Sequence, residues 1–133
     1  MDDYDRGGHA KYSLTVHMIF VTKYRKKLFF GETDDDIKQF LYDAANAIDI
    51  RVIVMETDKD HVHMLIRYKP YMNVAHIASQ LKQRSTYSMW KQHSELLKRN
   101  YWKHKILWSD GYFACSIGQV SQKNIEHYIQ NQG

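Results

Sequence analysis

The sequence has a single cysteine and a single proline among 133 residues, and it has no long apolar run. With Cys115 alone, neither an internal disulfide nor a cysteine-built zinc site can form, so any metal needs histidine, carboxylate or amide ligands. No segment approaches the roughly 18 apolar residues of a transmembrane helix, and the first residues are too acidic for a signal peptide. Proline-rich linkers and low-complexity stretches are also missing. We therefore expect one cytoplasmic domain over residues 1–133, with no membrane partner.

Two features of the composition are unusual. Lysine and arginine (19) exceed aspartate and glutamate (15), which gives a net charge of +4 and a pI near 9.1. This balance permits nucleic-acid binding without requiring it. Ten tyrosines, three tryptophans, five phenylalanines and eight histidines suit a surface on which bases stack, but the aromatic residues would equally fill the core of a small domain.

The first third of the chain predicts a strand followed by a helix. Apolar and polar residues alternate over 12–22, which indicates a strand with one buried face and with His17 on the other. After Gly31, Thr33 and the three aspartates that follow it predict a helix start, with Thr33 as the N-cap. Apolar residues of this helix recur at helical spacing: Ile37, Phe40, Leu41, Ala44 and Ile48.

The remainder predicts a hairpin, a second helix, a fourth strand and a last helix. The runs 51–57 and 61–68, joined by residues 58–60, are typical of a hairpin. Asn73 caps the second helix, and Ser121 caps a last helix running towards Gln132. The inner stripe of the second helix is Val74, Ile77, Ala78 and Leu81. Residues 111–117 form the fourth strand, whereas the polar segment 95–105 receives no assignment.

The resulting order is strand, helix, strand, strand, helix, strand, helix. It matches the split βαβ pattern of ferredoxin-like domains, with one helix added at the C-terminus. The predicted fold class is therefore α+β, with an antiparallel sheet and an extra C-terminal helix that carries Tyr128. Such a fold hosts many functions, so it implies none by itself.

His61 and His63 are separated only by Val62 in a predicted strand. Side chains alternate along a strand, so both imidazoles project to one side while Val62 and Met64 point into the core. Such a pair can hold a divalent cation if a further ligand arrives from elsewhere. An isolated pair of this kind is also compatible with two solvated histidines on an open sheet face.

Tyr128 and Gln132 lie four residues apart on the last helix and therefore share one face. Ile125 and Ile129 provide an adjacent apolar stripe, so Tyr128 is not needed for packing, although a tyrosine covering the edge of the core is the simpler interpretation. His127 points about 100° away around the helix and suits the same site less well.

Taken together, these segments resemble the HUH single-tyrosine transposases of the 200/605 insertion-sequence type, often called TnpA. The resemblance spans nearly the whole chain, and its pieces are short but specific in their order and spacing. They are residues 17–27, residues 60–66, Leu81 with Lys82 and Ser85, Tyr101 with Trp102, residues 107–113 and residues 128–132.

The resemblance implies a transposase that cleaves and rejoins single-stranded DNA. The metal ligands of the family map onto His61, His63 and Gln132, and its nucleophile maps onto Tyr128. A phenol is a poor nucleophile at pH 7, so a cation, Mg²⁺ or Mn²⁺, is expected to polarise the scissile phosphate. Attack would leave a 5′-phosphotyrosine and a free 3′-OH, so rejoining needs no nucleotide cofactor. The family's substrate is a DNA hairpin at the element's end, and its members are homodimers.

Two basic groups are candidates for DNA binding. The densest cluster contains Lys23, Arg25, Lys26 and Lys27, next to aromatic residues that suit phosphate contacts with some stacking. The second helix adds Lys82, Arg84 and Lys91. Solvated charged surfaces would give the same patterns.

Two alternatives to the transposase remain. One is an HUH endonuclease that nicks single-stranded DNA for replication or for processing repeated elements. The other is a non-catalytic domain that binds single-stranded nucleic acid through the aromatic residues of its sheet.

Overall fold

A computed structural model describes residues 13–118 and 126–131 of the chain. The elements follow one another as β1 (Leu14–Val21), the 3₁₀ turn η1 (Lys23–Arg25), α1 (Glu32–Ala47), β2 (Arg51–Asp58), β3 (His61–Tyr68), α2 (Val74–Gln92), α3 (Ser94–Asn100) and β4 (Phe113–Ile117). Residues 126–130 are also helical. Every helix in these described ranges is too short or too polar to cross a membrane.

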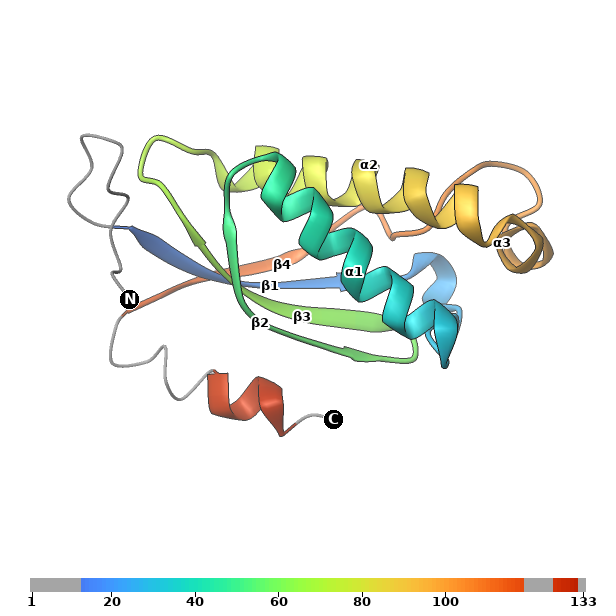
Figure 1. Ribbon diagram of the computed structural model, residues 1–133, viewed down its shortest axis with the longest axis horizontal. Helices are drawn as coiled ribbons and strands as arrows, with labels where there is room; N and C mark the ends of the chain where they lie inside the picture. Colours follow the sequence, from blue (N-terminus) through green and yellow to red (C-terminus); the bar gives the residue numbers. More distant parts are fainter. Residues whose placement is uncertain (1–12, 119–125, 132–133) are drawn as a thin grey trace.

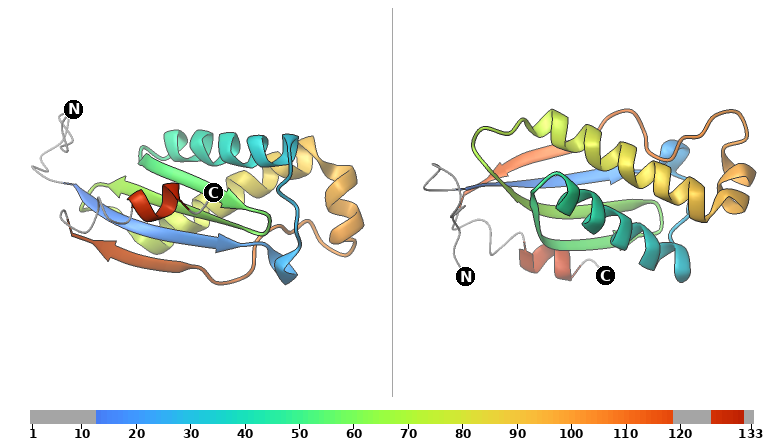
Figure 2. Two further views of the ribbon diagram at one scale, coloured as in Figure 1. Left: turned by 90° about the horizontal axis from the view of Figure 1, so that it is seen from below. Right: turned by 45° about the horizontal axis from the view of Figure 1, so that its top comes forward.

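The four strands form one antiparallel sheet in the order β2-β3-β1-β4. This order places the first and third strands in the centre and confirms the predicted split βαβ arrangement of an α+β fold. α1 and α2 cover one face of the sheet, and the helical segment 126–130 lies on the opposite face (Figures 1 and 2). The sheet therefore has a layer on each side.

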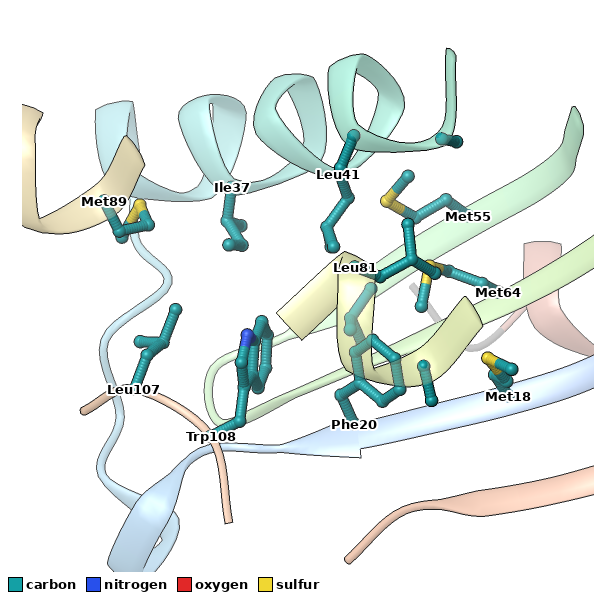
Figure 3. Packing of buried hydrophobic residues seen from close by; sticks show 14 of the residues in the cluster. Met18, Phe20, Ile37, Leu41, Met55, Met64, Leu81, Met89, Leu107 and Trp108 are labelled. Carbon is teal, nitrogen blue, oxygen red and sulfur yellow. The ribbon is translucent and has the colours of Figure 1, made fainter. Parts of the chain in front are cut away.

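The main core lies between the sheet and the helices α1 and α2 (Figure 3). Burying a large apolar side chain contributes about 1.5–3 kcal/mol, so this layer supplies most of the stability. Seven of its fully buried side chains are Met18, Phe20, Ile37, Leu41, Val62, Met64 and Leu81. The helical spacing of Ile37 and Leu41 and the alternation of Val62 and Met64 are thus confirmed as core patterns.

A second, smaller cluster covers the other face of the sheet. It contains Val54, Leu65 and Ile129, the last two with no exposed surface. The prediction that the first strand has one buried face is therefore wrong. His17, on its supposedly open side, is only 7% exposed, because side chains of the neighbouring strands pack against it.

The start of α1 also differs from the prediction. Gly31, with φ of 51°, occupies the N-cap position, and Thr33 lies inside the first turn. Thr33 instead closes the preceding loop: its hydroxyl donates to Leu28 O at 2.6 Å and accepts from Phe30 N at 3.0 Å. A positive φ favours glycine, which lets the chain turn at Gly31 into the first residue of the helix.

The hairpin and the second helix agree with their predictions. β2 and β3 pair directly across a tight turn, with a register shift between Val52 and Val54. Asn73 caps α2 by accepting a hydrogen bond from His76 N at 3.0 Å. The unassigned segment 95–105 contains most of α3, whose Leu97 is fully buried. Ser121 and Ile125 lie outside the described residues.

A buried hydrogen bond joins α2 to the segment before β4. Ser85 Oγ accepts from Trp108 Nε1 at 3.0 Å and donates to Leu81 O at 2.7 Å. We predict that Ser85→Ala lowers the free energy of unfolding by about 1–3 kcal/mol, because the indole N–H loses its acceptor in a dry site. Urea denaturation would measure this. Ser88→Ala, on the same helix, is the control, and an equal effect of both substitutions would contradict the prediction.

Candidate active site

His61 and His63 are the first and third residues of β3. Alternation turns both away from the main core, and their ring centroids lie 4.9 Å apart. The predicted side-by-side placement is therefore confirmed. His63 is only 7% exposed, so this is a shielded pair rather than two solvated histidines on an open face.

Asp60 contacts the first histidine. Its Oδ1 lies 2.8 Å from His61 Nδ1, and its Oδ2 accepts from Arg25 Nε at 3.2 Å. Burial alone would raise the pKa of Asp60, but the hydrogen bond with His61 and the charge of Arg25 outweigh it and hold the pKa below its usual value. A charged carboxylate therefore stands beside His61.

His17 contacts the second histidine. His17 Nε2 and His63 Nδ1 are 3.4 Å apart, and the two rings stack with centroids 5.6 Å apart. Sequence reasoning placed His17 on the correct face of its strand but missed this contact, because the contact depends on the pairing of β1 with β3. Asp60 was also missed, although a carboxylate next to a histidine is a signal in itself.

The environment of His63 keeps its ring neutral. Burial, followed by the like charges of His61 and His17, lowers the pKa of His63 to about 4. Burial likewise lowers the pKa of His17. Metal binding requires the neutral imidazole, so His63 is available as a ligand at pH 7 without competition from a proton.

Tyr128 lies in the helical segment 126–130 and is 54% exposed, whereas the adjacent Ile129 is fully buried. Ile129 lies in one buried cluster with Val54 and Leu65, and Leu65 shares a face of β3 with His61 and His63. The tyrosine-bearing segment therefore covers the sheet face that carries the histidines. Gln132, the predicted third ligand, lies outside the described residues.

The described side chains provide only part of a metal site. Within residues 13–118 and 126–131, no group of three or more histidine, cysteine, aspartate or glutamate side chains is placed to hold one. His61 and His63 thus offer two imidazole nitrogen donors and need oxygen ligands from elsewhere. This set fits a cation that shares its coordination with an amide, water or phosphate.

The predicted basic cluster forms a strained turn after β1. Tyr24 and Arg25 adopt left-handed conformations, with φ of 61° and 52°, which cost about 1–3 kcal/mol each in non-glycine residues. Hydrogen bonds hold the turn: Tyr101 Oη donates to Lys23 O at 2.7 Å, and Lys23 N donates to Leu107 O at 2.8 Å. Burial raises the pKa of Tyr101 to about 12, so its hydroxyl remains a donor.

The four basic residues of this turn have different surroundings. Arg25 reaches Asp60 and so connects the turn to the histidines. Lys23 pairs with Asp110 at 3.4 Å. Lys27 is exposed and Lys26 is half-buried.

Lys82 and Arg84, on α2, lie in the layer on the other side of the sheet. Lys82 Nζ donates to the carbonyl oxygens of Ser109 and Gly111, both at 2.8 Å, and to that of Asp110 at 3.2 Å. Its three N–H groups therefore fix the loop before β4, and burial lowers its pKa. Arg84 is exposed and donates to Gln80 Oε1 at 3.2 Å. The structure does not bring either residue to the histidines.

Solved structures define the class of protein. The chain superposes on the crystal structure of a candidate transposase from Deinococcus radiodurans R1 with a TM-score of 0.77 and 28% identity, over 97% of this chain and 98% of the other. A REP-associated tyrosine transposase bound to a REP hairpin superposes with a TM-score of 0.63 over 97% of this chain and 70% of the other. At 11% identity, the second likeness shows the fold alone.

Sequence relatives identify the family. The chain is 29% identical to the transposase for insertion sequence element IS200 of Salmonella typhimurium, over 99% of this chain and 85% of the relative. It is 31% identical to the ISDra2 transposase TnpA of Deinococcus radiodurans, over 96% and 89%. Residues 10–132 match the family described as "Transposase IS200 like". The chain belongs to this family of DNA-processing enzymes, which confirms the resemblance noted from its sequence.

The lowered pKa of His63 predicts a pH dependence of stability in the metal-free protein. Between pH 4 and 6.5 the unfolded chain binds a proton at this residue that the native state does not, so stability falls as the pH falls through this window. We expect His63→Asn to reduce the change in urea midpoint between pH 4.5 and 7, measured in EDTA. Exposed His76→Asn is the control. An unchanged pH slope in His63→Asn would contradict the assignment.

Proposed function

We propose that this transposase cleaves and rejoins single-stranded DNA at the ends of an insertion sequence through a 5′-phosphotyrosine on Tyr128. One observation carries the proposal: Ile129 packs the tyrosine-bearing segment into a buried cluster with Val54 and Leu65, over the sheet face that holds His61 and His63. More than half of the Tyr128 side chain is exposed there, so a DNA strand has access to it. We propose that residues 1–133 form one catalytic domain.

The reaction requires no external energy source. The Tyr128 oxygen attacks the scissile phosphorus, a P–O bond to tyrosine forms, and the bond to the 3′ oxygen breaks. The tyrosine proton is lost to solvent, and the departing 3′ oxygen is protonated to a 3′-OH. Attack by the 3′-OH of another strand on the phosphotyrosine reverses these steps and restores Tyr128. The protein thus exchanges strands without a nucleotide cofactor.

We assign His61, His63 and Gln132 as the ligands of a divalent metal. A bound ion would polarise the scissile phosphate and offset the charge that develops on its oxygens. Mg²⁺ prefers oxygen ligands and water, whereas two imidazoles favour a softer ion, so we expect both Mg²⁺ and Mn²⁺ to support cleavage. The neutral state of His63 supports this role.

A DNA hairpin is the proposed substrate end, a ligand that the REP-associated structural neighbour is described as binding. The positive charges of the basic turn suit the phosphate backbone. They belong to Lys23, Arg25, Lys26 and Lys27, and exposed Tyr24 beside them can stack on a base. On α2, Arg84 and Lys82 are further candidates for contact with DNA phosphates.

A cavity of about 740 Å³ lies beside α2 and includes Tyr87, Trp90, Lys91 and Trp108 in its lining. Both indole N–H groups are already bonded, to Ile106 O and Ser85 Oγ. Both tryptophans are less than a tenth exposed, whereas Tyr87 is 70% exposed and is the aromatic side chain of the lining on which a base could stack. This cavity supports nucleic-acid contact on α2.

We further propose a homodimer. β4 lies at an edge of the sheet, and four of its five residues are exposed, so its outer backbone groups can pair with the same strand of a second copy. Cys115 is the middle residue of β4 and is exposed. Pairing about its centre would bring the two cysteines together.

Sedimentation velocity should accordingly show a particle of twice the 15.9 kDa chain mass. Mild oxidation should then give a crosslinked dimer on a non-reducing gel, and Cys115→Ser should remain uncrosslinked. A monomer at all concentrations would exclude the homodimer, whereas a dimer without crosslinking would place the interface elsewhere.

The central test is covalent capture of DNA. Wild-type protein incubated with hairpin-bearing single-stranded oligonucleotides and Mg²⁺ or Mn²⁺ should give an adduct on a denaturing gel. Tyr128→Phe should abolish the adduct while hairpin affinity stays within about threefold, because only the nucleophilic oxygen is lost. EDTA should have the same effect on the adduct, and exposed Tyr71→Phe is the matched control.

The same assay separates the alternatives. Joining of two donor ends into a circle, followed by insertion into a target, supports the transposase. Cleavage without joining would indicate an endonuclease of the same type. DNA binding with no metal-dependent adduct would leave only the non-catalytic binding domain.

A further inference from the structure

We propose that His17 and Asp60 are positioning residues for the metal ligands. Each holds one imidazole through its Nδ1 atom, Asp60 acting on His61 and His17 on His63, so that Nε2 of both rings is left to bind the cation. This inference rests on the proposed metal site at His61 and His63.

Asp60 determines the tautomer of His61. A carboxylate only accepts hydrogen bonds, so the 2.8 Å contact between Asp60 Oδ1 and His61 Nδ1 requires the proton on Nδ1. In the neutral ring, Nε2 then carries the lone pair that a metal needs. Asp60 is itself held from the other side, since its second oxygen accepts from Arg25 Nε at 3.2 Å. The carboxylate is 15% exposed, which limits competition from water.

His17 determines the tautomer of His63 by a different route. Of His17 Nε2 and His63 Nδ1, 3.4 Å apart, one must donate and the other accept. If His17 donates, both nitrogens of neutral His63 are occupied and the ring cannot bind a metal. If His63 donates from Nδ1, its Nε2 is free. Only the second arrangement is compatible with a metal ligand, and it makes His17 the acceptor.

Packing fixes the orientation of this second pair. His17 and His63 are each 7% exposed, and their rings are within 17° of parallel. Phe113 packs edge-on against His17 with centroids 5.7 Å apart. The strand register, with Ile19 opposite His63 and Leu65 opposite His17, fixes the backbone of both residues. Partners of this kind, which orient a ligand without touching the metal, typically change metal affinity 10- to 100-fold.

Mn²⁺ binding to the full-length protein, followed by the EPR signal of free Mn²⁺, tests the proposal without relying on activity. We expect Asp60→Ala and His17→Phe to weaken binding by about 10- to 100-fold. Asp60→Asn and His17→Gln keep an oxygen that can accept from Nδ1 and should stay within about threefold of wild type. Asp110→Ala is the matched control, because Asp110 also pairs with a residue of the basic turn, Lys23, but not with a histidine. Phenylalanine keeps the ring stack, so His17→Phe isolates the hydrogen bond from packing.

A second measurement reads the tautomers directly. Two-bond ¹H–¹⁵N spectra of the wild-type imidazoles at pH 8 should show His61 and His63 protonated at Nδ1 without metal, and Mn²⁺ should broaden their Nε2 signals first. His63 protonated at Nε2 would overturn the proposal even if a variant fails to fold.

The outcomes distinguish this inference from the proposed function. If His61→Ala abolishes Mn²⁺ binding but Asp60→Ala and His17→Phe bind as wild type does, the positioning role is wrong and the metal site stands. If His61→Ala also binds as wild type does, both are wrong. Loss of affinity in the two positioning variants, with recovery in Asp60→Asn and His17→Gln, supports both.

Discussion

The alternation of side chains along β3 is the constraint on which the rest of the structure depends. Val62 and Met64 fill the main core with no exposed surface, and this burial fixes which way the strand faces. His61 and His63 must then project from the other side. A slip of one residue would place two imidazoles in an apolar core and two large apolar side chains against the second layer. The register that stabilises the fold therefore also sets the position of the histidine pair.

Both faces of β3 are covered, and the two layers differ in kind. The layer of α1 and α2 is broad and apolar, and it supplies stability. The opposite layer is a small cluster of Val54, Leu65 and Ile129, and it places an exposed tyrosine over the histidine-bearing face. This arrangement combines a largely buried histidine pair with an accessible tyrosine, the proposed nucleophile.

Hydrogen bonds connect the basic turn to the histidines. Arg25 belongs to the charged turn that is proposed to contact DNA phosphates, and its guanidinium also holds Asp60 against His61. A phosphate that draws Arg25 away would remove one of the contacts that orient Asp60. Lys82 differs from Arg25 in its partners, because its ammonium group donates to carbonyl oxygens of the loop before β4. A basic residue can hold a loop, bind a ligand or do both, and its contacts show the structural part of that role.

Local patterns in the sequence determined most of the fold and part of the site. The helical spacing of Ile37 and Leu41, the cap at Asn73 and the alternation around His61 and His63 each depend on neighbours in the chain, so they were predictable. The second buried face of β1, the contact of His17 with His63 and the loop held by Lys82 join residues 27 to 46 positions apart. Such contacts arise from strand pairing and layer packing, which no single segment encodes. The sequence by itself therefore determined the fold class and the histidine pair, and the tertiary structure decided which residues surround that pair.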